Sequence, residues 1–208
     1  MVAGLLNLKL TKMKTYEVTV IDYGIGNVWS VLSALNYLGV KTKLVSDAEE
    51  ISASPILILP GVGSFNQGMK VLKSRGLDKA ILTAVLTNNA KILGICLGMQ
   101  LMGSYSSEDQ GSPGLGLIPN YVDKFSDEEL CGNKVPHVGF NTVNYNAEDG
   151  FFTGLGSSSD FYFTHSYRML VDGLPGKCAT CTYDNEFLAA FQVGNIYGAQ
   201  FHPEKSQT

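Results

Sequence analysis

Cys96 carries the clearest chemical signal in the sequence, within the stretch GICLG at residues 94–98. An apolar strand is predicted at residues 92–95 and a helix should follow, which makes this the G-x-nucleophile-x-G turn of α/β enzymes with Cys in place of Ser. The flanking glycines permit a sharp turn that lifts the central side chain clear of the sheet. The helix that begins there offers free N–H groups and a positive dipole end, which favour a thiolate. We therefore expect Cys96 to be a nucleophile and the Leu97 N–H to face a developing oxyanion.

A thiolate nucleophile needs a base, and the base needs an orienting group. His202 has a carboxylate close by in His202-Pro203-Glu204, directly after a predicted strand at residues 196–201. Residues i and i+2 share a face in extended backbone, and Pro203 is expected to keep the backbone extended. Glu204 would then fix the tautomer of His202 and stabilise its charged form. Cys96, His202 and Glu204 are the predicted catalytic triad.

A glycine-rich turn, Pro60-Gly61-Val62-Gly63, follows a continuous apolar run at residues 56–59. In a parallel sheet such strand ends gather at the edge where ligands bind. Glycines there let backbone N–H groups approach a substrate, as an oxyanion hole requires. The same four residues are equally compatible with a plain loop.

Strand and helix patterns alternate along the first half of the chain and give way to short strands after Gly114. The predicted strands are 17–21, 41–45, 56–59, 92–95, 115–118, 142–145, 161–164, 177–183, 188–192 and 196–201, and the predicted helices are 28–38 and 77–85. This order predicts a three-layer α/β/α fold with a mostly parallel mixed central sheet and an antiparallel extension. We interpret residues 1–13 as an N-terminal tail and residues 14–208 as a single domain, because no linker composition separates the halves.

Composition excludes several classes of function. The 208 residues carry a formal net charge of -4, which argues against a nucleic-acid partner because no basic patch can displace phosphate counterions. No apolar run approaches the ~18 residues that span a bilayer, and the first residues lack a signal peptide's apolar core. We therefore expect no membrane partner and a cytoplasmic location. The four cysteines are too dispersed for a disulfide scaffold.

Two further motifs are weak. Gly24-Ile25-Gly26 begins like a dinucleotide fingerprint, but the third glycine position is Trp29, so a tight turn is the better interpretation. Cys178 and Cys181 form a CxxC within a predicted strand, where residues three apart point to opposite faces. The histidines show no metal-binding spacing either. We predict neither a metal nor another cofactor.

Taken together, these segments resemble the class I, or triad, glutamine amidotransferases. Among these, the chain is most similar to the glutaminase subunits of imidazole glycerol phosphate synthases. The matching segments are residues 21–27, 59–65, 94–101, 135–141, 165–167 and 200–206, within a resemblance that covers residues 16–206. The segments DYGIGN and PGVGSF separate this subfamily from other triad glutaminases.

The resemblance implies hydrolysis of L-glutamine to glutamate and ammonia. Cys96 attacks the side-chain amide, and the Leu97 N–H and a peptide N–H of the reoriented Gly61-Val62-Gly63 loop hold the oxyanion. His202, oriented by Glu204, protonates the leaving ammonia and then activates water. The residues implied to hold the amino-acid end of glutamine are Gln100, Glu108, Ser166 and Tyr167.

The resemblance also implies a heterodimer with a cyclase subunit, a (β/α)₈ barrel that docks over the site. Ammonia then passes through the barrel to make imidazole glycerol phosphate and AICAR in histidine biosynthesis. The residues implied to face the barrel are Asn27, Tyr162, Lys205 and the segment 137–140, which includes His137 and Phe140.

Three alternatives follow from the same residues. Phe140 stands where relatives usually carry Trp, so a paralogous glutaminase that supplies ammonia to a sugar-amidating synthase is the nearest. The related cysteine peptidases and chaperone-like proteins carry His directly after the nucleophile, where this chain has Leu97. A catalytically silent regulator is expected to lack a member of the triad, and all three are present here.

Overall fold

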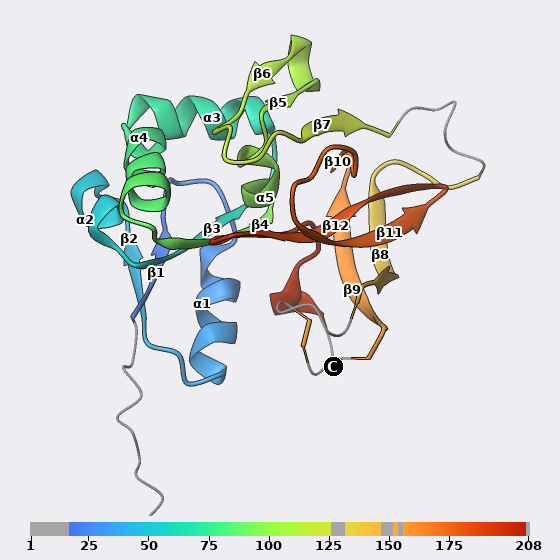
Figure 1. Cartoon of the computed structure of the whole chain (residues 1–208), viewed down its shortest axis with the longest axis horizontal. Helices are drawn as coiled ribbons and strands as arrows, with labels where there is room; N and C mark the ends of the chain where they lie inside the picture. Colours follow the sequence, from blue (N-terminus) through green and yellow to red (C-terminus); the bar gives the residue numbers. More distant parts are fainter. Residues whose placement is uncertain (1–16, 126–131, 147–151, 154–155, 207–208) are drawn as a thin grey trace, which may run out of the picture.

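Within the described residues, nine strands form one continuous sheet at the centre of the protein (Figure 1). The computed structural model describes residues 17–125, 132–146, 152–153 and 156–206, so the predicted tail at residues 1–13 lies outside them. In spatial order the strands are β2 (Thr42–Val45), β1 (Val18–Ile21), β3 (Ile56–Gly61), β4 (Lys91–Cys96), β13 (Ile196–Ala199), β12 (Asn185–Val193), β11 (Lys177–Tyr183), β8 (His137–Asn144) and β9 (Ser158–His165).

The sheet is parallel in one half and antiparallel in the other. Strands β2, β1, β3, β4 and β13 run parallel, and each later neighbour in the order runs antiparallel. The apolar strand β3 is buried along nearly its whole length, as expected for a strand covered on both faces. The mixed sheet with an antiparallel extension is therefore confirmed.

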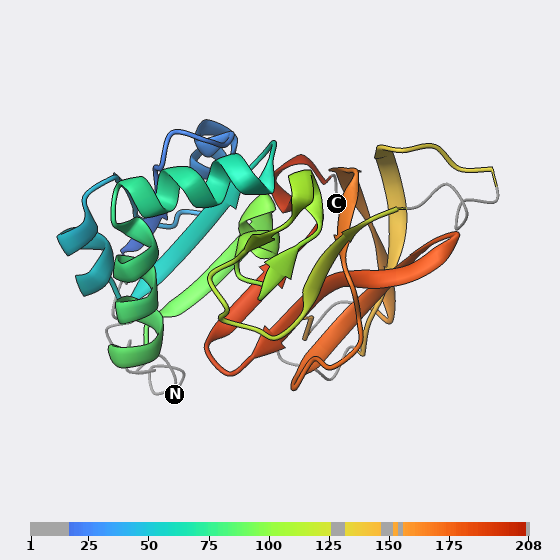
Figure 2. The same ribbon diagram turned by 90° about the horizontal axis from the view of Figure 1, so that it is seen from above.

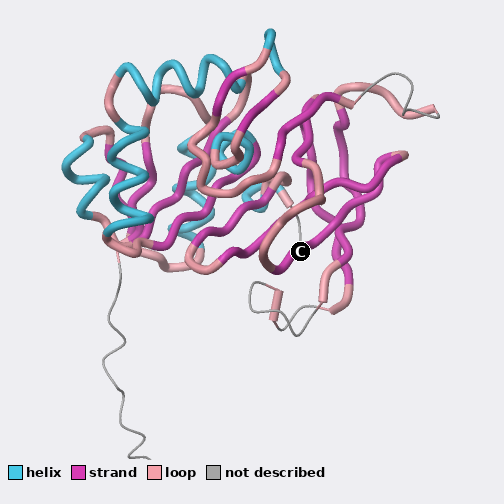
Figure 3. Tube along the Cα trace, turned by 45° about the horizontal axis from the view of Figure 1, so that its top comes forward, coloured by secondary structure: helices cyan, strands magenta, loops and turns pink. Residues whose placement is uncertain are grey.

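Helices cover both faces of the parallel half, which completes the predicted three layers. Helix α1 (Val28–Tyr37) lies on one face, and α3 (Phe65–Ser74), α4 (Leu77–Leu82) and α5 (Leu97–Leu101) lie on the other (Figures 1 and 2). A π-helical turn, Thr83–Thr87, continues α4, so the helix predicted at residues 77–85 is confirmed. In Figure 3 the helices gather over the parallel half of the sheet.

Two helices were not predicted, although Phe65, Met69 and Leu72 recur at helical spacing on the buried face of α3. Helix α2 (Ala48–Ala53) begins where the Asp47 carboxylate accepts the N–H groups of Glu49 and Glu50. Helix α3 begins where the Ser64 hydroxyl accepts the Gln67 N–H. Both are N-caps that satisfy helix donors which would otherwise lack partners.

A second, four-stranded sheet lies beside the first within the described residues. Its order is β10 (Tyr167–Met169), β7 (Tyr121–Lys124), β5 (Tyr105–Ser106) and β6 (Ser112–Pro113). The strand predicted at residues 115–118 is wrong. There, the Leu115 N–H binds the Leu101 carbonyl at 2.8 Å and the Leu117 N–H binds the Met102 carbonyl at 3.0 Å. These amides satisfy the free carbonyls at the end of α5, so they are not available to a sheet.

The core divides into three clusters of buried side chains. One lies under α3, α4 and α5, a second lies between α1 and the sheet, and a third, rich in phenylalanine, fills the antiparallel half. In the part of the chain that the structure describes, no helix is both long and apolar enough to cross a membrane. The carboxyl ends of β3, β4 and β13 meet at one edge of the sheet, and the candidate site lies there.

Candidate active site

Cys96 occupies a strained turn between β4 and α5. Its backbone has φ 53° and ψ -112°, a conformation that costs a residue with a side chain about 1–3 kcal/mol. The glycines around it have no room for a Cβ atom. At Gly98 it would overlap the Leu59 carbonyl, and at Gly94 it would lie 2.7 Å from the Gly98 carbonyl oxygen. The close approach of these backbones explains the two glycines and confirms the predicted sharp turn.

His202 and Glu204 form a buried pair behind Cys96. The His202 Nδ1–H donates to Glu204 Oε1 at 2.7 Å, and the two side chains are 2% and 3% exposed. The predicted contact is present, but the predicted extended backbone is wrong. Pro203–Lys205 form a 3₁₀ turn, closed by the Lys205 N–H on the His202 carbonyl at 3.0 Å. This turn brings the Glu204 carboxylate back toward the His202 ring.

The surroundings of His202 favour its charged form. Burial lowers the pKa of His202, but the interactions with Cys96 and with Glu204 outweigh it and raise the pKa to about 9. The second ring nitrogen, Nε2, has no hydrogen-bond partner among the described residues. His202 can therefore be charged at neutral pH, with the Nε2 proton free to be given to a ligand.

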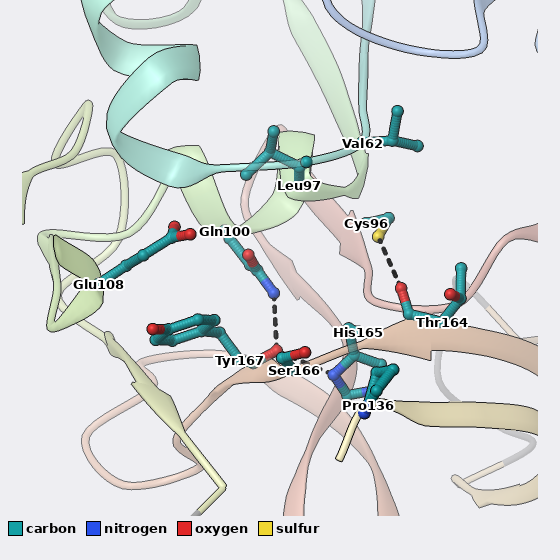
Figure 4. A pocket seen from close by; sticks show the side chains of 11 residues that line it. Val62, Cys96, Leu97, Gln100, Glu108, Pro136, Thr164, His165, Ser166 and Tyr167 are labelled. Carbon is teal, nitrogen blue, oxygen red and sulfur yellow. Dashed lines mark hydrogen bonds between the residues drawn. The ribbon is translucent and has the colours of Figure 1, made fainter.

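A pocket of ≈ 380 Å³ opens beside the Cys96 side chain (Figure 4). Its walls are Val62, Gly63, Cys96, Leu97, Gln100, Glu108, Pro136, Thr164, His165, Ser166 and Tyr167. All four residues predicted to hold glutamine are among them, together with the predicted nucleophile. His202 and Glu204 are buried outside the lining, and Gly61 is buried at the end of β3. The structure thus gathers the predicted residues around one cavity, supplied by segments far apart in the chain.

Gln100 is already engaged within the protein. Its Nε2 donates to the Tyr167 carbonyl at 2.8 Å (Figure 4) and to Gln200 Oε1 at 2.9 Å. Both amide protons are used, so Oε1 is the atom that Gln100 can offer to a ligand. Such an oxygen accepts a hydrogen bond from an ammonium or an amide N–H.

Glu108 forms the opposite, acidic wall. One of its carboxylate oxygens accepts the Phe65 N–H at the start of α3, at 2.5 Å. The Asn66 side chain also donates to the Glu108 carbonyl at 3.3 Å, which ties this loop to α3. The carboxylate points toward the pocket that it lines (Figure 4). A fixed negative charge here suits the α-ammonium group of an amino acid.

Gln200 was not among the predicted site residues. Its side chain is fully buried, and Nε2 lies 3.7 Å from the Cys96 Sγ. The Thr164 carbonyl, 4.0 Å from the same sulfur, was also missed. A signal for Gln200 exists, because it precedes His202 by two residues and side chains two apart in extended backbone share a face.

His137 was predicted to face a partner, and this prediction is wrong. Its side chain is 2% exposed, and its ring stacks on Tyr183 at 3.9 Å between centroids. Its Nδ1 lies 3.1 Å from the Nε2 of His165. In β8 the side chains alternate, so His137 points into the core while Val138 and Phe140 are 56% and 55% exposed.

The other predicted partner contacts lie at the surface. Asn27 and Lys205 are exposed, and Tyr162 is half-buried. Phe140 is paired with Tyr162 across β8 and β9, with ring centroids 5.5 Å apart. The Lys205 Nζ lies 5.8 Å above the centre of the Tyr162 ring. Phe140, Tyr162 and Lys205 therefore form one continuous group at the surface, here called the Phe140 patch.

A cysteine held on a strained strand-to-helix turn, beside a buried His–Glu pair and an open pocket, is the arrangement of an α/β enzyme with a cysteine nucleophile. Residues 19–208 match the family described as glutamine amidotransferase class-I. The chain therefore belongs to the class I glutamine amidotransferases.

Its relatives in that family include subunits of one synthase. It is 40% identical to the imidazole glycerol phosphate synthase subunit HisH 1 of Parasynechococcus marenigrum, over 92% of each chain. It is 42% identical to the subunit HisH of Moorella thermoacetica, over 91% of this chain and 88% of the relative. It is also 36% identical to the chloroplastic imidazole glycerol phosphate synthase hisHF of Arabidopsis thaliana, over 97% of this chain and 34% of that longer one.

Solved structures agree on the fold. A crystal structure of a glutamine amidotransferase superposes with a TM-score of 0.69 at 21% identity and covers 90% of each chain. A glutamine amidotransferase from Thermotoga maritima gives 0.60 at 15% identity, over 91% of this chain and 76% of the other. At such low identity these likenesses support the architecture alone.

Proposed function

We propose that this chain is the glutaminase subunit of an imidazole glycerol phosphate synthase, with Cys96, His202 and Glu204 as its catalytic triad. The observation that carries the proposal is the buried His202–Glu204 pair, 2.7 Å apart, together with the pocket of ≈ 380 Å³ that Cys96 lines. The relatives named as HisH subunits support the choice of synthase over a sugar-amidating one.

In the first step, the Cys96 thiolate attacks the side-chain amide carbon of glutamine. A sulfur–carbon bond forms, and the electrons of the carbonyl double bond move to its oxygen. The Leu97 N–H and the Val62 N–H are the proposed donors to this oxyanion, since both residues line the pocket beside the sulfur. The Leu97 N–H is fixed at the start of α5 and needs no reorganisation, whereas the Val62 N–H is proposed to reach the oxyanion after its loop reorients.

In the second step, His202 gives the proton on Nε2 to the leaving nitrogen. The carbon–nitrogen bond breaks, ammonia departs and a thioester remains on Cys96. Neutral His202 then accepts a proton from water as the water oxygen attacks the thioester. Collapse of the second tetrahedral intermediate releases glutamate and restores the thiolate, so each proton taken up is returned. Glu204 keeps the proton on Nδ1 throughout and stabilises the imidazolium.

Glutamine binds in the pocket with its two ends held differently. The Glu108 carboxylate and Gln100 Oε1 suit the α-ammonium group, one as a charge and one as an acceptor. Ser166 and Tyr167 complete the wall around the amino-acid end. The side-chain amide then points toward Cys96.

The partner is proposed to be a cyclase subunit with a (β/α)₈ barrel. The Arabidopsis relative supports a close association, since this chain matches only 34% of that single polypeptide. Ammonia that reaches water is protonated and loses its nucleophilicity, so the site must be covered while it turns over. The Phe140 patch and the exposed Asn27 offer the surface for such cover.

The test is glutamine hydrolysis with and without the cyclase subunit and its phosphoribosyl ligand. The rate of glutamine hydrolysis by the wild-type chain should rise when both are added, and Cys96→Ala should show no hydrolysis above background. Cys181→Ala is the matched control, because Cys181 is a free, fully buried cysteine in the antiparallel core. Failure of the cyclase to accelerate the wild type refutes the choice of synthase, and activity in Cys96→Ala refutes the nucleophile.

A further inference from the structure

The side chain of Gln200 has no evident place in the steps above. It is fully buried directly after β13, among residues of the apolar core, and it does not line the glutamine pocket. A buried amide costs about 1–3 kcal/mol for each hydrogen-bonding group left unsatisfied, and an apolar side chain of the same size avoids that cost. The contacts of its amide group must therefore explain why a polar side chain lies at this buried position.

These contacts form one chain of hydrogen bonds from the pocket wall to the nucleophile. The chain begins at the Tyr167 carbonyl, which accepts from Gln100 Nε2 at 2.8 Å. Gln100 Nε2 also donates to Gln200 Oε1 at 2.9 Å, and Gln200 Nε2 donates to the Cys96 Sγ at 3.7 Å. Three separate segments of the chain, around residues 96–100, 167 and 200, are joined in this way.

The direction of the chain is fixed by its first member. A backbone carbonyl can only accept, so Gln100 must turn its NH₂ group toward Tyr167. The second proton of that NH₂ group then requires an acceptor, which is Gln200 Oε1. Gln200 consequently presents its own NH₂ group, and never its oxygen, to the sulfur of Cys96.

The sulfur also has neighbours on its other sides. The Thr164 carbonyl oxygen lies 4.0 Å from Sγ and can only accept. Among the described residues, His202 Nε2 makes no hydrogen bond, to this sulfur or to any other atom. A sulfur that has lost its proton needs donors, and the Gln200 N–H is a fixed donor that does not depend on protonation. The Gln200 contact therefore holds the sulfur in one place and offers it a hydrogen bond that a thiolate can accept.

We infer that Gln200 is a positioning residue that orients the Cys96 sulfur for attack and locks the Gln100 amide in the orientation that receives glutamine. The inference rests on the proposed glutaminase function. It assigns two separable effects to one side chain: the N–H acts on the sulfur, and the oxygen acts on Gln100.

Two variants of nearly the same size separate these effects. In Gln200→Met both are lost, so the rate of Cys96 alkylation by iodoacetamide at neutral pH should fall about tenfold and the KM for glutamine should rise severalfold. In Gln200→Glu a carboxyl oxygen still accepts from Gln100, while the amide N–H that donates to sulfur is gone. Alkylation should therefore fall as in the Met variant, while KM stays within about twofold of the wild type. In both variants kcat should fall about tenfold or more.

Alkylation is followed by mass spectrometry of the Cys96 peptide, so the other cysteines do not interfere, and it requires neither glutamine nor a partner. Gln192→Met is the matched control, because the Gln192 amide binds Tyr197 Oη at 3.3 Å on the neighbouring strand. It should alkylate as fast as the wild type. Thermal unfolding of every variant identifies any that fail to fold.

Each result has a single interpretation. If Cys96 in either folded Gln200 variant is alkylated as fast as in the wild type, the inference is overturned. This conclusion does not depend on whether the cyclase subunit accelerates glutamine hydrolysis. A wild-type chain that never hydrolyses glutamine refutes the proposed function instead. A uniform loss of stability with unchanged alkylation and KM shows that Gln200 is merely structural.

Discussion

The imidazoles of His137 and His165 share one hydrogen bond in the protein interior, with His137 Nδ1 3.1 Å from His165 Nε2. His165 Nδ1 lies 2.8 Å from the Tyr167 carbonyl, which can only accept, so this nitrogen carries the proton. In the neutral ring His165 Nε2 is then an acceptor, and His137 Nδ1 must be the donor. The pair thus has one neutral tautomeric arrangement, and a proton added to His165 at Nε2 removes the acceptor and breaks the hydrogen bond.

Both rings resist protonation. Burial lowers the pKa of His137 to about 4. Burial, followed by the charges of His137, His202 and Arg168, lowers the pKa of His165 to about 3, although the Tyr167 carbonyl opposes the shift. In the unfolded chain both histidines titrate near pH 6.5. Between the folded-state pKa values and pH 6.5, the unfolded state therefore binds more protons than the folded state.

Acid is therefore expected to destabilise this protein well above the pKa of its carboxylates. The contribution of the pair to stability is complete above about pH 6.5 and is lost as the pH falls toward 4. Each histidine costs up to about 2 kcal/mol between pH 7 and pH 5. Urea unfolding at the two pH values measures the loss.

A matched variant identifies the source of that loss. His137→Asn places an amide N–H where the ring Nδ1–H was but cannot take up a proton. Its free energy of unfolding should depend less steeply on pH between 7 and 5 than that of the wild type. An unchanged dependence would show that the pair is not responsible.

His202 has the opposite linkage. Its pKa is raised to about 9 despite burial, so its contribution to stability is fully present below about pH 6.5 and is lost as the pH rises through 9. Glu204→Gln removes the charge that supports the imidazolium. The variant should lower the His202 pKa, seen by NMR titration, and reduce kcat at least about tenfold at neutral pH. Unchanged kcat would remove Glu204 from the triad.

The cysteine turn was predictable because its constraint is local. Gly94 and Gly98 lie two residues on either side of Cys96, and a side chain at either position would meet backbone. The parallel half of the sheet was predictable for a similar reason, since strands such as β3 and β4 are continuous apolar runs. Local chemistry and periodicity sufficed for both.

The errors arise where distant segments decide the outcome. His137 was placed on the surface because nothing local shows that the alternation of β8 turns it toward His165. Gln200 was missed because its significance depends on Gln100 and Cys96, about one hundred residues earlier. The strand predicted at residues 115–118 failed because its N–H groups bind the end of α5 instead.

Gly61 should not tolerate even a methyl group. A Cβ atom there would lie 2.5 Å from the Tyr23 hydroxyl and 3.0 Å from both the Gly98 nitrogen and the Leu97 Cβ. Gly61→Ala must therefore push β3 away from the cysteine turn, and we expect a loss of about 2 kcal/mol in stability with at least a tenfold loss in kcat. Gly39→Ala is the control, since a Cβ there meets open space and only the φ of 71° is unfavourable. Equal effects of both substitutions would contradict the crowding.

Tyr23→Phe should leave the protein as stable as the wild type or more so. The Tyr23 ring is 1% exposed, and its hydroxyl has no hydrogen-bond partner within the described part of the chain. Removing a buried group without a partner relieves its desolvation cost, about 1 kcal/mol. Tyr145→Phe, which breaks a 2.8 Å hydrogen bond to Ser159, should be destabilised by a similar amount. Thermal unfolding of the two variants should therefore shift in opposite directions, and a destabilised Tyr23→Phe would reveal a partner for the hydroxyl.

Phe140 should contribute to partner binding and little to folding. Its ring is 55% exposed and packs only partly on Tyr162, so Phe140→Ala should change the free energy of unfolding by less than about 1 kcal/mol. Aromatic anchors dominate protein interfaces, so the Kd for the cyclase subunit should rise at least about tenfold. Calorimetric titration measures this, with Tyr37→Ala as control because Tyr37 is 91% exposed at the end of α1. If both variants bind the cyclase as the wild type does, the partner docks elsewhere. If both weaken binding equally, the contact is not specific to the Phe140 patch.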